Sequence, residues 1–395
     1  MRTTPKIHPV EAALLSVLFA AAITLPVVKQ CFFGEFDTSA QEKRFLASPP
    51  VFSMGFKGKI RFLPQQIDAW FNDHFGFRAL LLSTGAQLKL HYLTASGHAI
   101  VGTEGWFFFK TEAPLFSESL TAGGLEKWKH YLEFRQRWLA ARGVKYLFVV
   151  APDKDSIYPE YLPAWAGRPP PELPVDQIIR HLRETHSDVD VLSLREALLD
   201  AKKIETRPLY FKQDTHWNTL GAFYGYRAIM QNIAQYFPGL VGKKRDDFRM
   251  VISKERGRDL VFMAGLPDLP IPDCPALEQI VPRASVIEEL SIPGFTGHAR
   301  VSQLKSAPGK LRMLTIHDSF TNALQPYYSE TFSSVTFMQM GFNRAGDEKV
   351  FAQTILEQKP DIVIEESIQR YVILLPDANS VFGGEDKAGP VDERH

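Results

Sequence analysis

The sequence predicts an α/β fold in which a mostly parallel β-sheet is sandwiched between helices. Segments with helical periodicity alternate with short runs of β-branched and aromatic residues along most of the chain. At Gly143 a charged amphipathic segment stops and an apolar run begins at once, as expected where a helix leads into a strand. The chain has 395 residues, of which 45% are hydrophobic, so it can bury a sizeable core.

The first expected element is an N-terminal helix that crosses a membrane. Residues 12–28 carry no charge, and this length is near the lower limit of about 17–25 residues for a spanning helix. Arg2 and Lys6 precede the run, so the positive-inside rule keeps that end in the cytoplasm and exports the remainder. A cleaved signal peptide is the alternative, because Ala20 and Ala22 could form a small-x-small site. The run continues past these alanines, which favours an uncleaved anchor.

The remaining chain is expected to form one domain between a linker and a tail. The boundaries follow from composition: anchor 1–33, polar linker 34–60, domain 61–375 and flexible tail 376–395. Helices are expected over 63–93 (two, with a turn at Gly76), 123–142, 176–187, 195–203, 219–237 and 347–358, with a helix or turn over 320–332. Strands are expected over 144–154, 189–194, 311–319, 334–340 and 361–367, a hairpin over 98–110, and a strand running into a loop over 208–218. Residues 240–310 are rich in proline and glycine and are expected to be a β-rich insertion.

Composition limits the partners. Lys plus Arg and Asp plus Glu both number 45, so the chain has no overall field that would attract nucleic acid, and an uncharged sugar is a compatible ligand. Cys31 and Cys274 are the two cysteines, and we expect them to be separate thiols. No cluster of cysteine and histidine has the spacing of metal ligands, so no metal site is expected.

Two polar stretches follow predicted strands and carry reactive residue types. Asp214 and His216 lie in "YFKQDTHWN", and Ser319 follows the apolar run 313–316. In a parallel sheet, ligands bind where the strands deliver their carboxyl ends into loops. His216 could accept the proton of the Ser319 hydroxyl, and Asp214 could orient the imidazole, while the hydroxyl forms an acyl-enzyme. Asp214 and His216 are two apart, so in an extended segment they point to the same side.

The residues alone leave a structural alternative open. An Asp-x-His sequence is often a hydrogen-bonded turn, and a serine after a strand is often a helix N-cap, a role that Asp318 could equally take.

The stretches "DTHWN" and "IHDSF" together resemble the signature pair of the SGNH-hydrolase-like proteins of bacterial exopolysaccharide O-acetylation, the AlgJ/AlgX-like family. The stretches "EKRFLASPP", "WFNDHFGFR", "VGTEGWFFF" and "APDKDSIYPEYLP" extend this resemblance from about residue 40 to near residue 371. It implies an SGNH-hydrolase-like (flavodoxin-like) fold with Asp214, His216 and Ser319 as the catalytic triad. The serine comes last, which resembles the permuted order of the acetylation proteins. His317 departs from the Gly-Asp-Ser sequence that is usual around the nucleophile, because it stands at the position of the glycine.

The resemblance implies a periplasmic, membrane-anchored O-acetyltransferase that acts on an exported polysaccharide, alginate-like or another. No cofactor is implied for this chain, because a multi-span membrane-bound O-acyltransferase partner would supply the acetyl group. Two alternatives stay open: a carbohydrate acetylesterase with the same triad, in which water is the acceptor, and a catalytically silent polysaccharide-binding subunit of an export or acetylation complex.

Five further residues are expected to line the cleft and bind substrate. Aromatic side chains can stack on sugar rings, and polar ones can donate hydrogen bonds to the oxyanion or the sugar. For each of them a structural role is the alternative. They are Trp217, Asn322, Arg344, Tyr328 and Lys154.

Overall fold

The computed structural model describes residues 9–33, 38–39, 44–45, 47–49, 63–75, 84, 95–96, 98–110, 119–267, 269–281, 285–304, 311–340 and 348–376. The chain divides into two compact units, where the sequence predicted one domain over 61–375. Met1–Val101 and Asp259–Pro270 form the first unit, and Gly102–Arg258 and Ile271–His395 form the second.

The first unit contains the long helix α1 and several short elements. They are helices α1 (Pro9–Phe33), α2 (Leu63–Asp73) and α9 (Asp259–Met263), the antiparallel pair β1 (Thr38–Ser39) and β2 (Arg44–Phe45), and the antiparallel pair β3 (Ala95–Ser96) and β4 (Ala99–Val101). Helix α1 spans the charge-free run predicted to be an anchor. Among the residues that the structure describes, none of the helices combines the length and the apolar character needed to cross a membrane. Most of the second helix predicted within 63–93 lies outside the described residues, as does the tail from residue 377 onwards.

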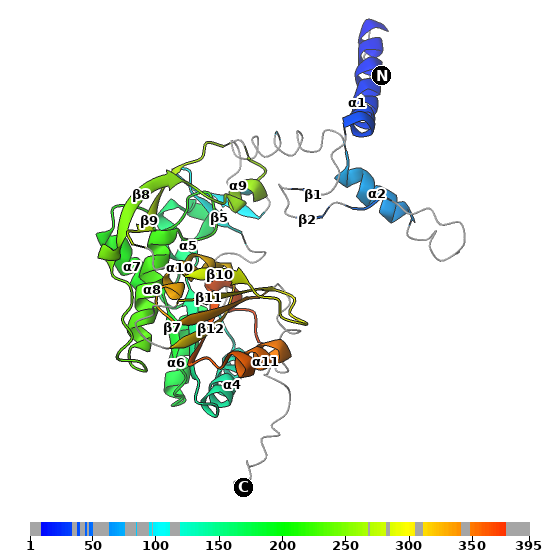
Figure 1. Cartoon of the computed structure of the whole chain (residues 1–395). Helices are drawn as coiled ribbons and strands as arrows, with labels where there is room; N and C mark the ends of the chain where they lie inside the picture. The colour runs from blue at the N-terminus through cyan, green and yellow to red at the C-terminus, as the bar shows by residue number, and fades with distance from the viewer. Residues whose placement is uncertain are drawn as a thin grey trace, which may run out of the picture. The chain divides into compact units, whose positions relative to one another are not determined.

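The second unit is built on a seven-stranded sheet (Figure 1). In spatial order its strands are β10 (Val286–Glu289), β11 (His298–Gln303), β13 (Ser334–Gln339), β12 (Arg312–His317), β14 (Ile362–Ile368), β6 (Lys145–Ala151) and β7 (Val191–Ser193). The five strands from β13 to β7 are parallel, and β11 and β10 are antiparallel to their neighbours. The sheet is therefore mixed, and the predicted parallel part extends from β13 to the edge strand β7.

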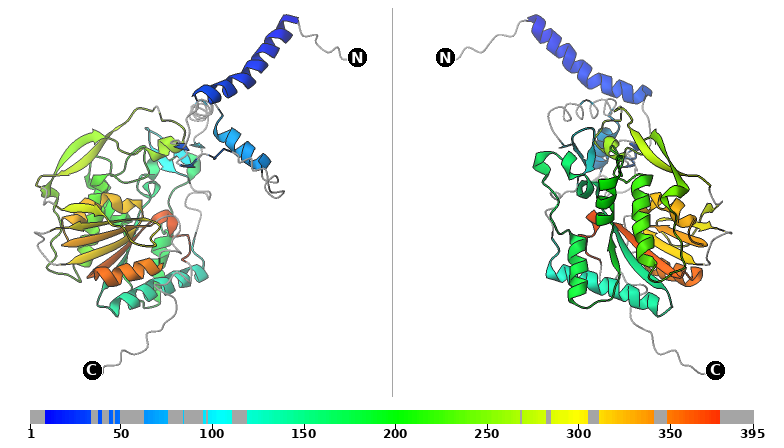
Figure 2. Two further views of the ribbon diagram at one scale, coloured as in Figure 1. Left: turned by 45° about the vertical axis from the view of Figure 1, so that its right-hand side comes forward. Right: turned by 90° about the vertical axis from the view of Figure 1, so that its left-hand side faces the viewer.

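Three helices cover one face of this sheet, namely α4 (Ala122–Ala140), α6 (Pro174–Glu184) and α11 (Glu348–Gln358) (Figure 2). Trp128 and Leu132 of α4 pack against Phe148 of β6 in a buried apolar cluster that also includes residues of α6, α11, β12 and β14. Helix α4 begins at Thr121, whose hydroxyl caps it, and Gly143 follows it with a φ of +71°, a value that glycine adopts without strain.

The helices α5 (Lys154–Ile157), α7 (Arg195–Ile204), α8 (Thr219–Ile233) and α10 (Gln325–Ser329) lie on the other side of the strands (Figure 1). Helix α7 packs against α8. Asn218 caps α8 by accepting a hydrogen bond from the Gly221 N–H at 3.1 Å. This cap fixes where the loop that carries Asp214 and His216 ends.

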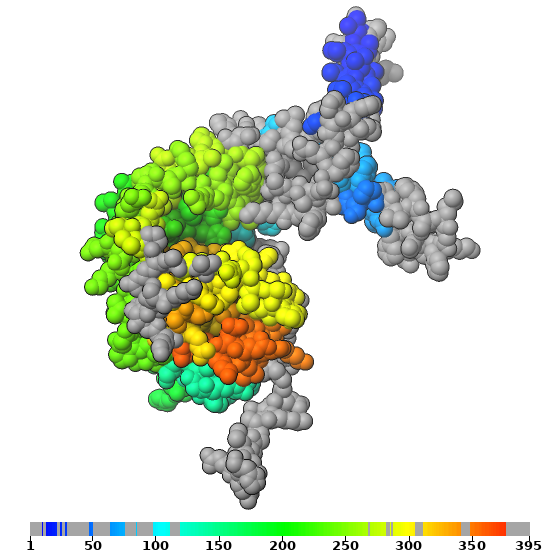
Figure 3. Space-filling view, viewed as in Figure 1, coloured from blue at the N-terminus to red at the C-terminus, as the bar shows by residue number. Residues whose placement is uncertain are grey.

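The predicted insertion over 240–310 is in part an extension of the main sheet. Strands β8 (Phe248–Lys254) and β9 (Asp273–Gln279) form a separate antiparallel ribbon, whereas β10 and β11 join the sheet at its edge. Phe295, just before β11, packs against Phe351 of α11, and the yellow and orange atoms of these segments adjoin in the space-filling view (Figure 3). Cys274 of β9 is a buried free cysteine.

Candidate active site

Asp214 and His216 lie on a closed loop and do not follow a strand of the sheet as predicted. Tyr210 and Trp217 form an isolated antiparallel bridge, and the Asn218 N–H donates to the Leu209 carbonyl at 3.0 Å. The chain thus folds back on itself between α7 and α8. Its backbone groups find partners within the loop and in neighbouring side chains, so sheet pairing is not required.

Ser319 lies where the sequence predicts it, just after a parallel strand. Strand β12 ends at His317, and a 3-10 turn runs from Ser319 to Ala323. Asp318 is the N-cap of this turn: one carboxylate oxygen accepts from the Phe320 N–H at 2.8 Å, and the other accepts from the Ile368 N–H of β14 at 2.7 Å. Because Asp318 takes the capping role, the partly exposed Ser319 hydroxyl is available for another partner.

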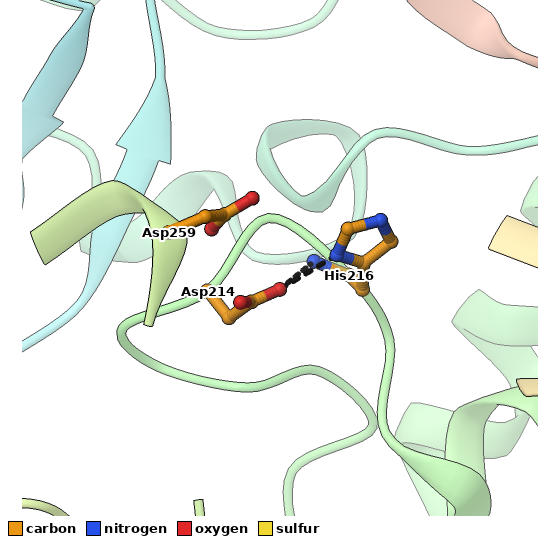
Figure 4. A group of neighbouring side chains, drawn as sticks. All are labelled: Asp214, His216 and Asp259. Carbon is orange, nitrogen blue, oxygen red and sulfur yellow. Dashed lines mark hydrogen bonds and ion pairs between the residues drawn. The ribbon is translucent and has the colours of Figure 1, made fainter. Parts of the chain in front are cut away.

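The structure brings the three predicted residues into one hydrogen-bonded series. His216 Nε2 is 2.7 Å from Ser319 Oγ, and His216 Nδ1 is 2.7 Å from Asp214 Oδ1 (Figure 4 shows the Asp214–His216 bond). A carboxylate only accepts, so we assign the imidazole proton to Nδ1, which leaves Nε2 to accept from the serine hydroxyl. The imidazole is 28% exposed and the carboxylate 7% exposed. The arrangement can therefore take a proton from a serine that solvent and ligands can reach.

Both oxygens of the Asp214 carboxylate are engaged. Oδ1 also accepts from the backbone N–H of His216 at 3.0 Å, and Oδ2 accepts from the backbone N–H of Arg258 at 2.8 Å. Hydrogen bonds to both oxygens fix the plane of the carboxylate relative to the imidazole.

Burial perturbs the pKa of two titratable groups beside the nucleophile. Burial raises the pKa of Glu366 well above its ordinary value, and its Oε2 accepts from the Thr321 hydroxyl at 3.0 Å. Burial lowers the pKa of His317 to about 4. Its Nδ1–H donates to the Asp318 carbonyl at 2.6 Å, and its ring packs edge-on against Phe337. His317, the departure from glycine, is thus a buried neutral residue under the serine turn.

The expected substrate contacts of Trp217, Tyr328 and Lys154 do not agree with their positions. All three side chains are buried, with exposed fractions of 0%, 1% and 3%, so a sugar ring cannot stack on them. The indole N–H of Trp217 donates to the Phe320 carbonyl at 3.0 Å, which joins the two loops of the site. Asn322 is exposed, and its substrate contact stays a prediction. Arg344 lies outside the described residues.

Sequence reasoning missed the residues that hold the Asp214 loop, namely Glu255, Gly257 and Arg258, and the structural role of Lys154. The stretch "ERGR" (255–258) has no motif that links it to "DTHWN", and the two meet only in the folded chain.

The fold and the site together define a class of domain. A serine after a parallel strand of an α/β sheet, bonded to a histidine and an aspartate from another loop, is the arrangement of an SGNH-hydrolase-like domain. Residues 99–291 match the family model described as "SGNH hydrolase-like domain, acetyltransferase AlgX", a range that includes Asp214 and His216 and ends before Ser319. This part of the chain, just under half of it, is similar to that family, and the resemblance of the chain to AlgJ/AlgX-like proteins is confirmed.

Known proteins resemble the chain over different extents. It is 30% identical over 125 residues to the probable alginate O-acetylase AlgJ of Pseudomonas aeruginosa, a stretch that covers 31% of this chain and 30% of that protein. The structure of Bacillus cereus PatB1 with a sulfonyl adduct has a TM-score of 0.51 at 17% identity, covering 70% of this chain and 97% of that one, a likeness of fold alone. The structure of the O-acetyltransferase domain of Pseudomonas putida AlgJ aligns at 18% identity with a TM-score of 0.49. The alignment covers 72% of this chain and 95% of that domain.

Proposed function

We propose that this protein is an O-acetyltransferase that transfers acetyl groups to hydroxyls of an exported polysaccharide, alginate-like or another exopolysaccharide. The observation that carries the proposal is the hydrogen-bonded series of Ser319, His216 and Asp214, with a partly exposed hydroxyl and imidazole. The match to the AlgX-type acetyltransferase domain supports acetyl transfer over other reactions of a serine nucleophile.

The reaction has two half-steps. Ser319 Oγ attacks the carbonyl carbon of the acetyl donor while His216 Nε2 takes the hydroxyl proton, and the imidazolium then gives this proton to the leaving group. In the second half-step His216 takes a proton from the sugar hydroxyl, whose oxygen attacks the carbonyl carbon of the acetyl-serine, and the imidazolium gives this proton to Ser319 Oγ as the serine ester bond breaks. Asp214 stabilises the imidazolium in both steps. The N–H of Ser319 opens the 3-10 turn, where helix starts leave backbone donors without intrahelical partners, so it can donate to the oxyanion.

The proposed setting is the periplasmic side of the inner membrane, with the N-terminal segment 1–33 as the anchor that the sequence predicts, although none of the described helices meets the length and apolar character of a membrane span. Its support is the charge-free run 12–28 and the exposed apolar side chains of α1, among them Leu14, Leu18 and Phe19. In this setting a multi-span membrane-bound O-acyltransferase would supply the acetyl group, and this chain needs no cofactor of its own.

The experiment that tests the proposal uses the purified protein, p-nitrophenyl acetate as donor and uncharged or uronate oligosaccharides as acceptors. Mass spectrometry should detect acetylated oligosaccharide with the wild type and none with Ser319→Ala. The matched control is Ser302→Ala on β11, because the buried Ser302 hydroxyl has no hydrogen-bond partner among the described residues. Release of acetate alone would favour the esterase. Transfer that persists in Ser319→Ala would remove the serine mechanism, and the absence of both transfer and acetate release in the wild type would favour the silent subunit.

A further inference from the structure

The loop that carries Asp214 is held from one side by a buried ammonium group. Lys154 is 3% exposed, and its Nζ donates to the carbonyl oxygens of Phe211 at 2.9 Å, Lys212 at 3.2 Å and Asp214 at 2.7 Å. A lysine ammonium has three donors and no acceptor, so these three carbonyls match its capacity. Lys154 comes directly after the carboxyl end of β6, which ties the loop to the sheet.

A buried carboxylate holds the N–H groups of the same loop. Glu255 is 6% exposed and accepts from the backbone N–H groups of Gln213 at 2.7 Å and Lys212 at 3.2 Å. Burial raises the pKa of Glu255 to about 7, and the nearby charge of Lys154 lowers it. Thus a buried ammonium satisfies the carbonyls and the oxygens of a buried carboxyl group satisfy the amides. Burying two charges is costly, and a loop whose groups faced water would need neither of them.

The next residues after Glu255 bring a backbone N–H to the Asp214 carboxylate. Gly257 has a φ of +99° and Arg258 a φ of +90°, a region that side chains other than glycine rarely adopt. The Arg258 N–H donates to Asp214 Oδ2 at 2.8 Å, and its side-chain Nε donates to Gln213 Oε1 at 2.8 Å. A Cβ on residue 257 would lie 2.2 Å from Asp214 Oδ2, so only glycine leaves room for the carboxylate.

We propose that residues 255–258, together with Lys154, form a positioning element that aims the Asp214 carboxylate at His216 and so makes Ser319 nucleophilic; this rests on the proposed function. The terminal torsion of an aspartate is soft, so the carboxylate needs a fixed second partner to keep Oδ1 against Nδ1. The Arg258 N–H is that partner. None of these residues touches the reacting atoms, so they act through Asp214.

The first test compares Gly257→Ala with Gly143→Ala. Gly143 has a φ of +71° and open space where a Cβ would lie, so its variant carries the same kind of backbone strain without the clash. The measurement is the second-order rate at which phenylmethylsulfonyl fluoride modifies Ser319 in the full-length chain at pH 7, followed by mass spectrometry. We expect Gly257→Ala to react about 10- to 100-fold more slowly, since small misplacements of catalytic groups have effects of this size. Gly143→Ala should react within about twofold of the wild type. Equal rates for Gly257→Ala and the wild type would overturn the proposal.

A double-mutant cycle separates positioning from general damage to the fold. In an Asp214→Asn background, Gly257→Ala should cause no further loss of rate, because the carboxylate on which it acts is gone. Losses that multiply in the double variant would refute an action through Asp214. If Gly257→Ala does not fold, Glu255→Gln provides the same cycle: it keeps the size and one acceptor oxygen, and a reaction about two- to tenfold slower than wild type is expected. A wild-type rate for Glu255→Gln would likewise count against the proposal.

The outcomes distinguish this proposal from the proposed function. Sulfonylation reports the nucleophilicity of Ser319 and needs no sugar acceptor. A slow Gly257→Ala with no acetyl transfer in the wild type would keep the positioning element and reject the transferase. Acetyl transfer with an unaffected Gly257→Ala would do the reverse.

Discussion

Trp217→Phe tests how the two loops of the site are held together. Trp217 follows His216 directly, and its indole N–H donates to the carbonyl of Phe320, the residue after Ser319, at 3.0 Å. The two rings also meet edge-on at 5.4 Å. The substitution keeps an aromatic ring at a site that is 0% exposed but removes this hydrogen bond between the histidine loop and the serine turn.

Two contributions determine the size of the effect on stability. The buried Phe320 carbonyl loses its donor, which costs about 1–3 kcal/mol. The smaller ring also leaves empty the space beside Gly225, where Cη2 and Cζ3 of the indole lie 3.2 Å from a Cβ position, and a void of this size costs about 1–2 kcal/mol. The free energy of unfolding should therefore fall by about 2–5 kcal/mol, and looser alignment of His216 with Ser319 should slow sulfonylation about tenfold.

The matched control is Trp128→Phe. Trp128 is also buried, at 1% exposure, and its indole N–H donates to the Val372 carbonyl at 2.9 Å. It packs among Tyr131 and Phe148 on the α4 side of the sheet, apart from the catalytic loops. Urea unfolding should give similar losses for both variants, whereas the sulfonylation rate should fall only for Trp217→Phe. If both variants react like the wild type, or both slow equally, the Trp217–Phe320 link does not align the site.

Two further substitutions have expected outcomes. Asp214→Asn should lower the rate of acyl-enzyme formation by about 10³- to 10⁴-fold, because the amide places the imidazole proton of His216 on the wrong nitrogen; rates measured from pH 5 to 9 that stay near wild type would contradict the assigned role. The second substitution concerns His317, whose pKa is about 4 in the folded protein and about 6.5 in the unfolded chain. Between these two pH values the unfolded chain binds a proton that the folded protein does not. The free energy of unfolding of the wild type should therefore fall by up to about 3 kcal/mol as the pH is lowered from 6.5 to 4. His317→Asn can retain a donor to the Asp318 carbonyl and should not show this loss. Urea unfolding midpoints of both proteins at pH 4.5 and pH 7 measure the difference. An equal change of the midpoint with pH in both proteins would contradict the assignment to His317.

The sequence predicted the central elements well because their periodicity reflects burial. The helix expected over 123–142 is α4 (Ala122–Ala140), and the strand expected over 361–367 is β14 (Ile362–Ile368). Strand β11, which lies next to the edge strand β10, was less evident, because an antiparallel strand with one face open to solvent tolerates the polar residues of "HARVSQ". The strand expected at 208–213 was wrong, because its apolar residues Leu209 and Tyr210 are buried in a loop, and a short apolar run has no period that separates the two.

The triad was predictable because its parts lie in two short motifs, whereas the residues that hold it were not. Lys154 was expected at an open cleft because it lies just past a predicted strand end, yet its side chain is buried and its ammonium donates to three carbonyls of the Asp214 loop. Glu255 and Gly257 lie in the segment that directly follows β8, and no spacing in the chain links them to Asp214. Such contacts depend on tertiary structure, which local patterns do not contain.

The two halves of the site are stabilised in different ways, and this difference explains where the buried charges lie. Ser319 follows a central parallel strand, and the hydrogen bonds of Asp318 to the turn and to β14 fix it to the sheet. The loop of Asp214 and His216 has no strand in that sheet, so side chains must satisfy its peptide groups. An ammonium offers three donors and a carboxylate offers two acceptor oxygens, so each can satisfy several peptide groups of one kind at once. The burial of Lys154 and Glu255 therefore follows from placing a histidine and its carboxylate on a loop outside the sheet, and it makes this loop the part of the site whose alignment is most sensitive to substitution.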